Sequence, residues 1–289
     1  MDNPITDINW TGKTEIIDDI AAQGSSLTVC SLESGLEAEV IKIDTDAASY
    51  VLKVWNKGSR PDVGYQYRLL HTLYERGLAV SKPFGWGANS NGESVLLTSY
   101  DGIPVLKVNK QKMTEIAHIL SNIHKVPTEE LDDSLLRKYD FIRYFYPEIE
   151  QFPELHHQLT HLVENANIRQ DTLIHGDFNL GNILENEGQY RVIDWTNGQL
   201  GDPRYDVAWS GILMRIYAGE RQHSVFLSAY AAENKLVSDE KERFEAMACL
   251  RWILLDKLAG LPKRADTMKR VKDIIKKNAH LNESIDLLL

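Results

Sequence analysis

The chain has 289 residues, of which 43% are hydrophobic and 26% are charged, and its formal net charge is −10 at pH 7. This length and composition suit a globular protein with one large domain or two lobes. The negative charge argues against a nucleic-acid-binding surface, and no apolar run approaches the roughly 20 residues that span a bilayer.

The first hundred residues predict a sheet with one helix. Apolar residues three or four positions apart predict a helix over 62–76, which ends at Gly77. The segments Gly85–Gly87 and Asn91–Gly92 predict turns around two more strands. The second of these two strands is predicted at 94–98. Apolar and alternating runs predict three earlier strands, at 27–30, 38–43 and 50–55.

From about Asp101 onward the pattern changes to that of helices, with a brief return to short strands between 172 and 194. Asp239 with Glu242 predicts a capping box. The basic segment 263–278 predicts a solvated helix face rather than a membrane- or partner-binding one. The helices are predicted at 111–124, 154–168, 204–218, 222–234, 239–259 and 265–279.

Strands followed by helices predict an α+β fold of two lobes. We expect residues 1–99 to form a small sheet-rich lobe and residues 100–289 a larger helical lobe, with a hinge near 98–103. A ligand site between two lobes is common.

The most informative stretch is 175–184, His-Gly-Asp-Phe-Asn-Leu-Gly-Asn-Ile-Leu. Asn182 follows Asp177 by five residues, and Asp194 follows Asn182 by twelve. Phosphoryl transfer uses such a set: one carboxylate orients the attacking hydroxyl, while an amide and a second carboxylate hold Mg²⁺ on the nucleotide phosphates. Taken singly, Asp177 could form an Asx turn toward Asn179, Asn182 could cap a helix or a turn, and Asp194 could end a strand. Their joint spacing favours the catalytic interpretation, because Asp and Asn are spaced as in the H-R-D-x-x-x-x-N loop of protein kinases.

Two departures from the protein-kinase pattern point to a family. Gly176 replaces the Arg of that loop, and Trp195 replaces the Phe of D-F-G. This variant, together with Gly-Asp-Pro-Arg-Tyr-Asp-Val-Ala at 201–208, resembles the aminoglycoside phosphotransferase family, which includes choline-kinase-like and other small-molecule kinases. The resemblance implies a two-lobed protein-kinase-like fold. Because Gly176 lacks a guanidinium, we expect no control by a phosphorylated activation loop.

The same resemblance implies an enzyme, a phosphotransferase that acts on an alcohol group. It would transfer the γ-phosphoryl group of ATP or GTP to a hydroxyl of an aminoglycoside-like antibiotic or an amino-alcohol or sugar-like metabolite. Asp177 would be the catalytic base or would orient the hydroxyl, and Asn182 and Asp194 would hold Mg²⁺. His175 is expected to brace the loop, and Asp206 to cap or anchor the next helix.

The resemblance also implies a phosphate-binding lysine, Lys53, although a Lys on the solvent face of an edge strand would show the same sequence pattern. The usual Glu partner of this Lys is missing. Gln66 occupies the nearest matching position, and Glu75 is a more distant candidate.

Further nucleotide contacts are expected in two segments. Ser34 and Gly35 belong to the predicted phosphate-covering loop, where backbone amides of a Ser/Gly turn can bind anions. Thr98 and Tyr100 belong to the segment that resembles the lobe connection whose backbone meets adenine.

Two functional hypotheses therefore stand beside each other: a small-molecule kinase, and a non-catalytic kinase-fold protein that binds a nucleotide or a partner. Gln66 and the acidic residues of the phosphate loop motivate the second. Acceptor-binding groups are expected in the helical lobe, where clustered acidic side chains could bind amines or could equally be solvated surface. These side chains are Glu129, Glu130, Asp132, Asp133, Glu148 and Glu150.

Cellular location and partners follow from weaker signals. The N-terminus lacks the charged and apolar segments of a signal peptide. Cys30 and Cys249 are far apart in the sequence, so we expect reduced, buried thiols as in a cytosolic protein. We expect a cytoplasmic monomer or homodimer that binds no nucleic acid and no membrane. The acidic surface suits a cationic acceptor, although many cytosolic proteins are equally acidic.

Overall fold

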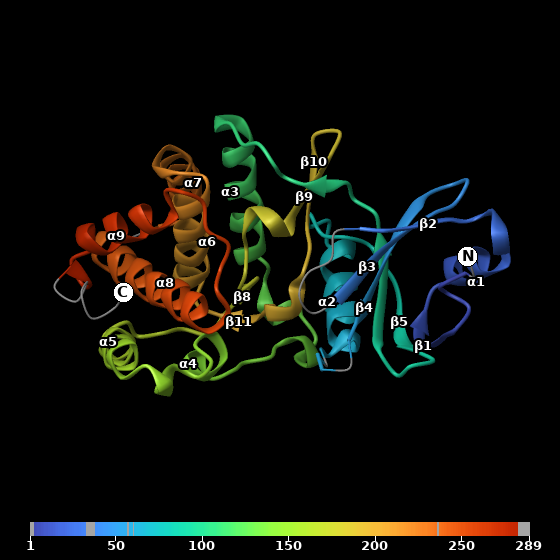
Figure 1. Cartoon of the computed structure of the whole chain (residues 1–289), viewed down its shortest axis with the longest axis horizontal. Helices are drawn as coiled ribbons and strands as arrows, with labels where there is room; N and C mark the ends of the chain where they lie inside the picture. The colour runs from blue at the N-terminus through green and yellow to red at the C-terminus, as the bar shows by residue number, and fades with distance from the viewer. Residues whose placement is uncertain (1–2, 33–37, 57, 60, 236, 283–289) are drawn as a thin grey trace. The chain divides into compact units, whose positions relative to one another are not determined.

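The computed structural model describes residues 3–282, except 33–37, 57, 60 and 236. The chain divides into two compact units (Figure 1). The sheet unit comprises Met1–Pro104 and Ile183–Thr196, and the helical unit comprises Val105–Asn182 and Asn197–Leu289. The predicted α+β class is confirmed: an N-terminal antiparallel sheet is followed by a larger, mainly helical part. Within the described residues, no helix is both long and apolar enough to span a bilayer.

A six-stranded antiparallel sheet forms the main part of the sheet unit, in the order β1-β5-β6-β4-β3-β2. Tyr50 and Leu52 of β4 alternate into the hydrophobic core that also contains residues of α1, so Lys53 lies on the opposite face of the strand. The strands are β1 (Ile8–Lys13), β2 (Thr28–Ser31), β3 (Ala38–Asp44), β4 (Ser49–Trp55), β5 (Pro83–Asn89) and β6 (Ser94–Ser99).

Two α-helices and a smaller sheet complete the sheet unit. Helix α1 (Ile16–Ala22) buries Ile17 and Ile20, and a short 3₁₀ turn, η1 (Gly24–Ser26), follows it. Helix α2 (Val63–Glu75) packs against β5 and β6, and its N-cap is Asp62, whose side chain accepts the Tyr65 N–H. The smaller sheet has the order β10-β9-β7 and consists of β7 (Ile103–Pro104), β9 (Ile183–Asn186) and β10 (Gln189–Val192).

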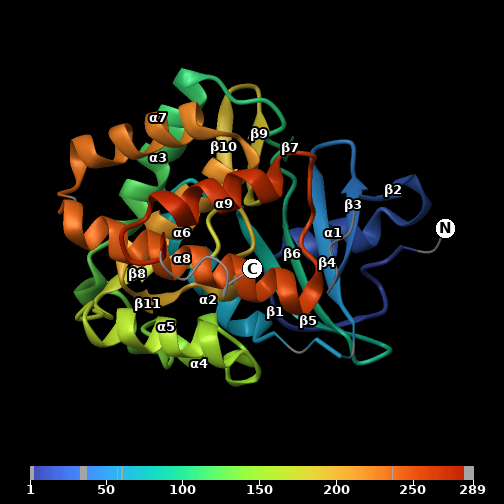
Figure 2. The same cartoon turned by 60° about the vertical axis from the view of Figure 1, so that its left-hand side comes forward.

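The helical unit is built around α8, which is buried without interruption from Phe244 to Leu254 and packs against α5, α6 and α9 (Figure 2). Strands β8 (Thr172–Ile174) and β11 (Gln199–Gly201) form an antiparallel pair, and β8 contacts α3 and α6. The α-helices are α3 (Lys110–His124), α4 (Phe141–Phe145), α5 (Pro153–Glu164), α6 (Pro203–Tyr217), α7 (Glu220–Glu233), α8 (Ser238–Ala259) and α9 (Thr267–Lys277). The 3₁₀ turns are η2 (Thr128–Glu130), η3 (Asp133–Leu135), η4 (Ile149–Gln151), η5 (Leu180–Asn182) and η6 (Trp195–Asn197), the last of which begins in the sheet unit.

Some sequence expectations for the sheet unit were wrong. Strand β1 and helix α1 were not predicted at all. Gly85–Gly87 is not a turn but part of β5, where a Cβ on Gly87 would lie 2.2 Å from the Asn9 carbonyl oxygen, so glycine allows β1 to pair closely. Cys30 is exposed rather than buried, because β2 is an edge strand of the sheet.

Two details of the helical unit also differ from expectation. Helix α5 ends at Glu164, four residues before the predicted end. No capping box starts α8, because Val237 is the N-cap and makes no side-chain cap bond, while Asp239 already lies in the first turn. Helix α9 is amphipathic as predicted: Val271, Ile274 and Ile275 are buried, and its lysines are exposed.

Candidate active site

Asp177 lies in the helical unit, on the loop between β8 and η5. Its carboxylate accepts three N–H groups. Trp209 Nε1 donates to Oδ1 at 2.8 Å, and the Nδ2 atoms of Asn179 and Asn182 donate to Oδ2 at 3.2 and 3.1 Å. A carboxylate has about four acceptor positions, so this geometry fixes the group and leaves capacity for a substrate hydroxyl.

The two asparagines of the loop differ in how their side-chain oxygens are used. Asn179 Oδ1 accepts the Gly181 N–H at 2.8 Å, which makes it an Asx-turn residue. Asn182 donates its Nδ2 to the Asp177 carbonyl at 2.9 Å as well as to the carboxylate. Since its nitrogen faces Asp177, Asn182 can offer Oδ1 to a hard cation such as Mg²⁺. The structure thus makes Asn182 a better candidate metal ligand than Asn179.

Gly176 is required by the local geometry. Its φ is +76°, and a Cβ there would lie 2.8 Å from both Cβ and the carbonyl oxygen of Asn197. The Tyr144 hydroxyl donates to Asn197 Oδ1 at 3.1 Å, and burial raises the pKa of Tyr144 to about 12. No side chain fits at residue 176, which excludes the arginine of the protein-kinase loop. A guanidinium reaches the loop from α8 instead, where Arg251 Nη1 donates to the Gly176 carbonyl at 2.9 Å.

Asp206, on α6, anchors the loop that carries Asp177. It is fully buried, and its carboxylate accepts the His175 and Gly176 N–H groups at 2.9 Å each and contacts His124 Nε2 at 3.1 Å. Burial alone would raise the pKa of Asp206, but the hydrogen bond and charge of His124 and the His175 amide lower that pKa below its ordinary value. His175 Nδ1 in turn accepts the Asp177 N–H at 3.2 Å, which is the bracing role expected of it.

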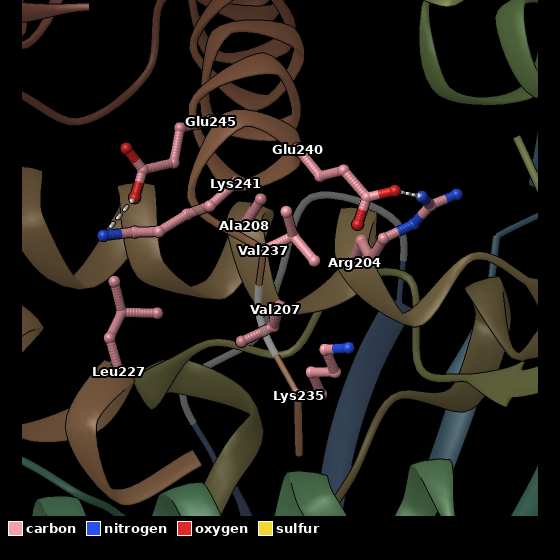
Figure 3. A pocket seen from close by; sticks show the side chains of 9 residues that line it. All are labelled: Arg204, Val207, Ala208, Leu227, Lys235, Val237, Glu240, Lys241 and Glu245. Carbon is pink, nitrogen blue, oxygen red and sulfur yellow. Dashed lines mark hydrogen bonds and ion pairs between the residues drawn. The ribbon is translucent and has the colours of Figure 1, made fainter. Parts of the chain in front are cut away.

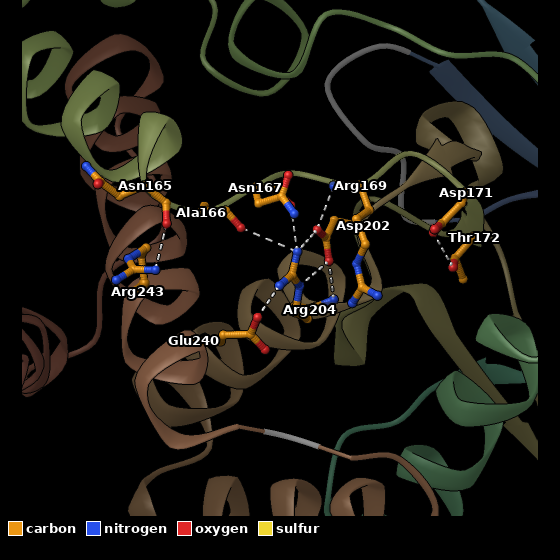
Figure 4. A network of polar contacts seen from close by, with 10 residues as sticks. All are labelled: Asn165, Ala166, Asn167, Arg169, Asp171, Thr172, Asp202, Arg204, Glu240 and Arg243. Atoms are coloured by element: carbon orange, nitrogen blue, oxygen red, sulfur yellow. Dashed lines mark hydrogen bonds and ion pairs between the residues drawn. The ribbon is translucent and has the colours of Figure 1, made fainter.

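The start of α6 is fixed by a network of polar contacts around Arg204 (Figure 4). Asp202, rather than Asp206, is the N-cap, and its side chain accepts the Arg204 N–H at 3.0 Å. The Arg204 guanidinium pairs with Asp202 at 2.7 Å and Glu240 at 2.6 Å, and donates to the Asn167 carbonyl at 3.0 Å. Because α6 also carries Asp206 and Trp209, this network holds the helix that orients Asp177.

In the sheet unit, Lys53 Nζ forms an ion pair with Asp194 at 3.3 Å. Strand β4 is interior, between β3 and β6, so the alternative of an edge-strand lysine is wrong. Asp194 has a φ of +62°, and non-glycine residues held in this region occur often at functional sites. Its Oδ1 also accepts the Thr196 hydroxyl at 2.7 Å, and Gln66 Nε2 donates to that hydroxyl at 3.4 Å. Gln66 therefore supports Asp194 through Thr196.

The structure gives less information on the other residues predicted to contact the nucleotide. Thr98 lies in β6, and its hydroxyl donates to the Ser99 carbonyl at 3.3 Å. The N–H of Tyr100 donates to the Ser49 carbonyl at 3.1 Å, so that amide is already used within the sheet unit. Ser34 and Gly35 lie outside the described residues.

The sequence match decides the family. Residues 28–247 match the model of APH, the phosphotransferase enzyme family. The chain belongs to this family. No curated protein sequence matches the phosphotransferase.

Solved structures show the fold to be protein-kinase-like. The phosphotransferase is similar to an amicoumacin kinase, hAmiN, in complex with AMP-PNP, Ca²⁺ and Ami, with 17% identity, a TM-score of 0.68 and 92% of each chain covered. It is similar to the aminoglycoside phosphotransferase APH(4)-Ia in a ternary complex with ADP and hygromycin B, with 15% identity, a TM-score of 0.68, and coverage of 92% of this chain and 99% of that one. A choline kinase from Cryptosporidium parvum Iowa II has 13% identity and a TM-score of 0.59, with coverage of 91% and 94%.

Sequence reasoning missed several residues of this phosphotransferase that contact the loop. Trp209 directly follows the recognised stretch at 201–208, and its position there was the available signal. Arg251 is the one charged residue in the apolar run 248–254, which was the second signal. Asn197 carried none, because its contact with Gly176 depends on the folded loop.

Two other regions do not add to the site. The acidic side chains suggested for acceptor binding, Glu129, Glu130, Asp132, Asp133, Glu148 and Glu150, are all exposed. A pocket beside α6 contains two ion pairs, Arg204–Glu240 and Lys241–Glu245, which largely satisfy the charges at its wall (Figure 3). Among the residues described, no group of three or more His, Cys, Asp or Glu side chains could hold a metal ion.

Proposed function

We propose that this phosphotransferase is an ATP- or GTP-dependent kinase that transfers the γ-phosphoryl group to a hydroxyl of a small molecule. The observation that carries this proposal is the geometry of Asp177, whose carboxylate is fixed by three N–H donors and keeps capacity for one more. A positioned carboxylate of this kind can align the acceptor hydroxyl and take its proton.

The remaining roles follow from the donor atoms. Asn182 and Asp194 each offer an oxygen, the donor type that Mg²⁺ prefers, and Mg²⁺ is usually held by one or two protein carboxylates together with substrate phosphates. Bound Mg²⁺ would neutralise charge on the phosphates, and Lys53, which lies on the face of β4 opposite the hydrophobic core, would bind phosphate oxygens.

Two considerations support a hydroxyl-bearing and cationic acceptor. Similar folds are an aminoglycoside phosphotransferase bound to hygromycin B, an amicoumacin kinase and a choline kinase. The net charge of −10 favours the approach of a cation. We therefore propose an aminoglycoside-like antibiotic or an amino-alcohol or sugar-like metabolite as the acceptor.

The non-catalytic alternative is less well supported. Gln66 motivated it, but Lys53 has a carboxylate partner in Asp194, and Gln66 supports that partner through Thr196. Calorimetric titration with ATP, in the presence and absence of Mg²⁺, separates the two hypotheses. The kinase proposal predicts Mg²⁺-dependent binding, whereas Mg²⁺-independent binding without turnover would favour a binding protein.

The direct test is nucleotide turnover across a panel of aminoglycosides, amino alcohols and sugars. We expect at least one acceptor to stimulate turnover by the wild type, and Asp177→Asn to lower the stimulated rate by roughly 10²- to 10⁴-fold. Asp171→Asn is the matched control, because Asp171 is exposed and lies shortly before β8. Equal rates for wild type and Asp177→Asn with every stimulating acceptor would contradict the proposal.

A further inference from the structure

Trp209 and Arg251 form one unit next to the catalytic loop, within the helical unit. The Trp209 indole donates to Asp177 Oδ1 at 2.8 Å, and Arg251 Nη1 donates to the Gly176 carbonyl at 2.9 Å. The guanidinium carbon of Arg251 lies 4.1 Å from the centre of the Trp209 ring and 4.7 Å from that of Phe145. Arg251 therefore contacts both the backbone before Asp177 and the ring that binds the Asp177 side chain.

The environment of Arg251 is unusual for an arginine. Arg251 is only 7% exposed, and its Nε atom has no hydrogen-bond partner among the described residues. Within the part of the chain that the structure describes, no carboxylate forms an ion pair with its guanidinium. Burying a guanidinium without a carboxylate partner is unfavourable, and contacts with two aromatic faces and a carbonyl offset only part of that cost. An apolar residue would fill the same space at lower cost. The charge and planar shape of this side chain thus point to a role in the loop.

The hydrogen bonds of the Asp177 carboxylate indicate what that role would be. Both asparagine amides bind the same oxygen, Oδ2, so they leave rotation about the bond to the carboxylate weakly restricted. The Trp209 N–H is the donor on Oδ1, and it fixes the plane of the group. The Trp209 ring, 3% exposed, is held in turn against the Arg251 guanidinium.

We infer that Trp209 is a positioning residue for Asp177, and that Arg251 keeps Trp209 and the Gly176 carbonyl in place. Protein kinases place an arginine next to the catalytic Asp in the sequence, whereas here Gly176 admits no side chain and the guanidinium comes from α8. This inference rests on the proposed function, in which Asp177 orients the acceptor hydroxyl.

The test compares two tryptophan substitutions by steady-state kinetics. Trp209→Phe keeps an aromatic ring against Arg251 and removes the N–H donor. Trp252→Phe is the matched control, because Trp252 is also buried in the same unit and donates its indole N–H to the Tyr217 hydroxyl instead. We expect Trp209→Phe to lower kcat roughly tenfold to hundredfold with the nucleotide KM unchanged, and Trp252→Phe to leave kcat near that of the wild type.

A double-mutant cycle shows whether Trp209 acts through Asp177. In an Asp177→Asn background, Trp209→Phe should cause no further loss of residual single-turnover rate. A tenfold further loss in that background would overturn the inference. If Trp209→Phe does not fold, Arg251→Lys decides: it retains the charge but not the planar fork, and should lower kcat at least about fivefold at unchanged nucleotide KM.

Failure of the inference and failure of the proposed function are distinguishable. A wild-type kcat for Trp209→Phe, with Asp177→Asn inactive, would overturn the positioning role and leave the kinase proposal standing. A fully active Asp177→Asn enzyme would overturn both.

Discussion

Replacing Asp206 by Asn should loosen the loop that carries Asp177 without changing the size of the residue 206 side chain. In the wild type, Oδ1 of Asp206 accepts the Gly176 N–H, while Oδ2 accepts the His175 N–H and contacts His124 Nε2. The amide of Asn has one oxygen and one NH₂ group. In either orientation the NH₂ group must face a buried N–H donor, so at least one hydrogen bond is replaced by a donor–donor contact.

The size of the effect follows from this burial. Asp206 is 0% exposed, and leaving a buried hydrogen-bond donor unsatisfied costs about 1–3 kcal/mol of the free energy of unfolding. For a chain of this length, that loss corresponds to a Tm lower by roughly 2–12 °C. We also expect slower turnover, because the same hydrogen bonds fix the backbone beside Asp177.

Urea and thermal unfolding at pH 7 measure this change, with Asp239→Asn as the control because its side chain is 84% exposed. That control should stay within about 0.5 kcal/mol of the wild type. Since the pKa of Asp206 is lowered on folding, its contribution is present above the ordinary carboxyl pKa of 3.8 and is lost as the pH falls through the folded value. The difference between wild type and Asp206→Asn should therefore narrow toward acid pH. Equal stability of the two Asn variants at pH 7 would refute the reasoning.

Three further substitutions test other parts of the site and its surroundings. Gly176→Ala should destabilise the protein by about 1–2 kcal/mol from the positive φ, plus the clash with Asn197, and the urea midpoint would reveal this; an unchanged midpoint would argue against the loop geometry. Burial, aided by the charge of Arg215, lowers the pKa of His223 from 6.5 to about 4, so up to about 3 kcal/mol of stability present above pH 6.5 should be lost as the pH falls toward 4. His223→Gln should flatten the stability–pH curve in that window, and an unaltered slope would count against this account. Lys53→Met should weaken Mg²⁺-nucleotide binding at least about tenfold in calorimetry, and wild-type affinity would remove Lys53 from the site.

Much of the fold was predictable because the patterns are long and regular. Helices α6 and α8 are long and contain many apolar residues, which predicts buried helices. Apolar and polar residues alternate in part of β4, which is typical of a strand. Strand β1 and helix α1 escaped prediction for a physical reason. Ile8 is the one buried residue of β1, and α1 has only seven residues, so both depend on packing against the rest of the sheet unit.

The site was predictable where chemistry is encoded by spacing along the chain. Asp177, Asn182 and Asp194 were found in this way, and their roles in catalysis and metal binding remain proposals. The partner of Lys53 was sought on the next helix, whereas the structure supplies Asp194 from after β10. Contacts of Trp209, Arg251 and Asp206 with the loop arise only when α6 and α8 pack beside β8 and the residues after it, and local sequence pattern does not encode them.

The most direct test of the central claim follows the γ-phosphoryl group itself. Wild type and Asp177→Asn are incubated with γ-labelled ATP, Mg²⁺ and the best acceptor from the panel, and the products are resolved by ³¹P NMR and mass spectrometry. The account predicts that the wild type places the label on an acceptor hydroxyl as a phosphate ester, and that Asp177→Asn does so roughly 10²- to 10⁴-fold more slowly. Label found only in inorganic phosphate, or transferred equally fast by Asp177→Asn, would contradict it.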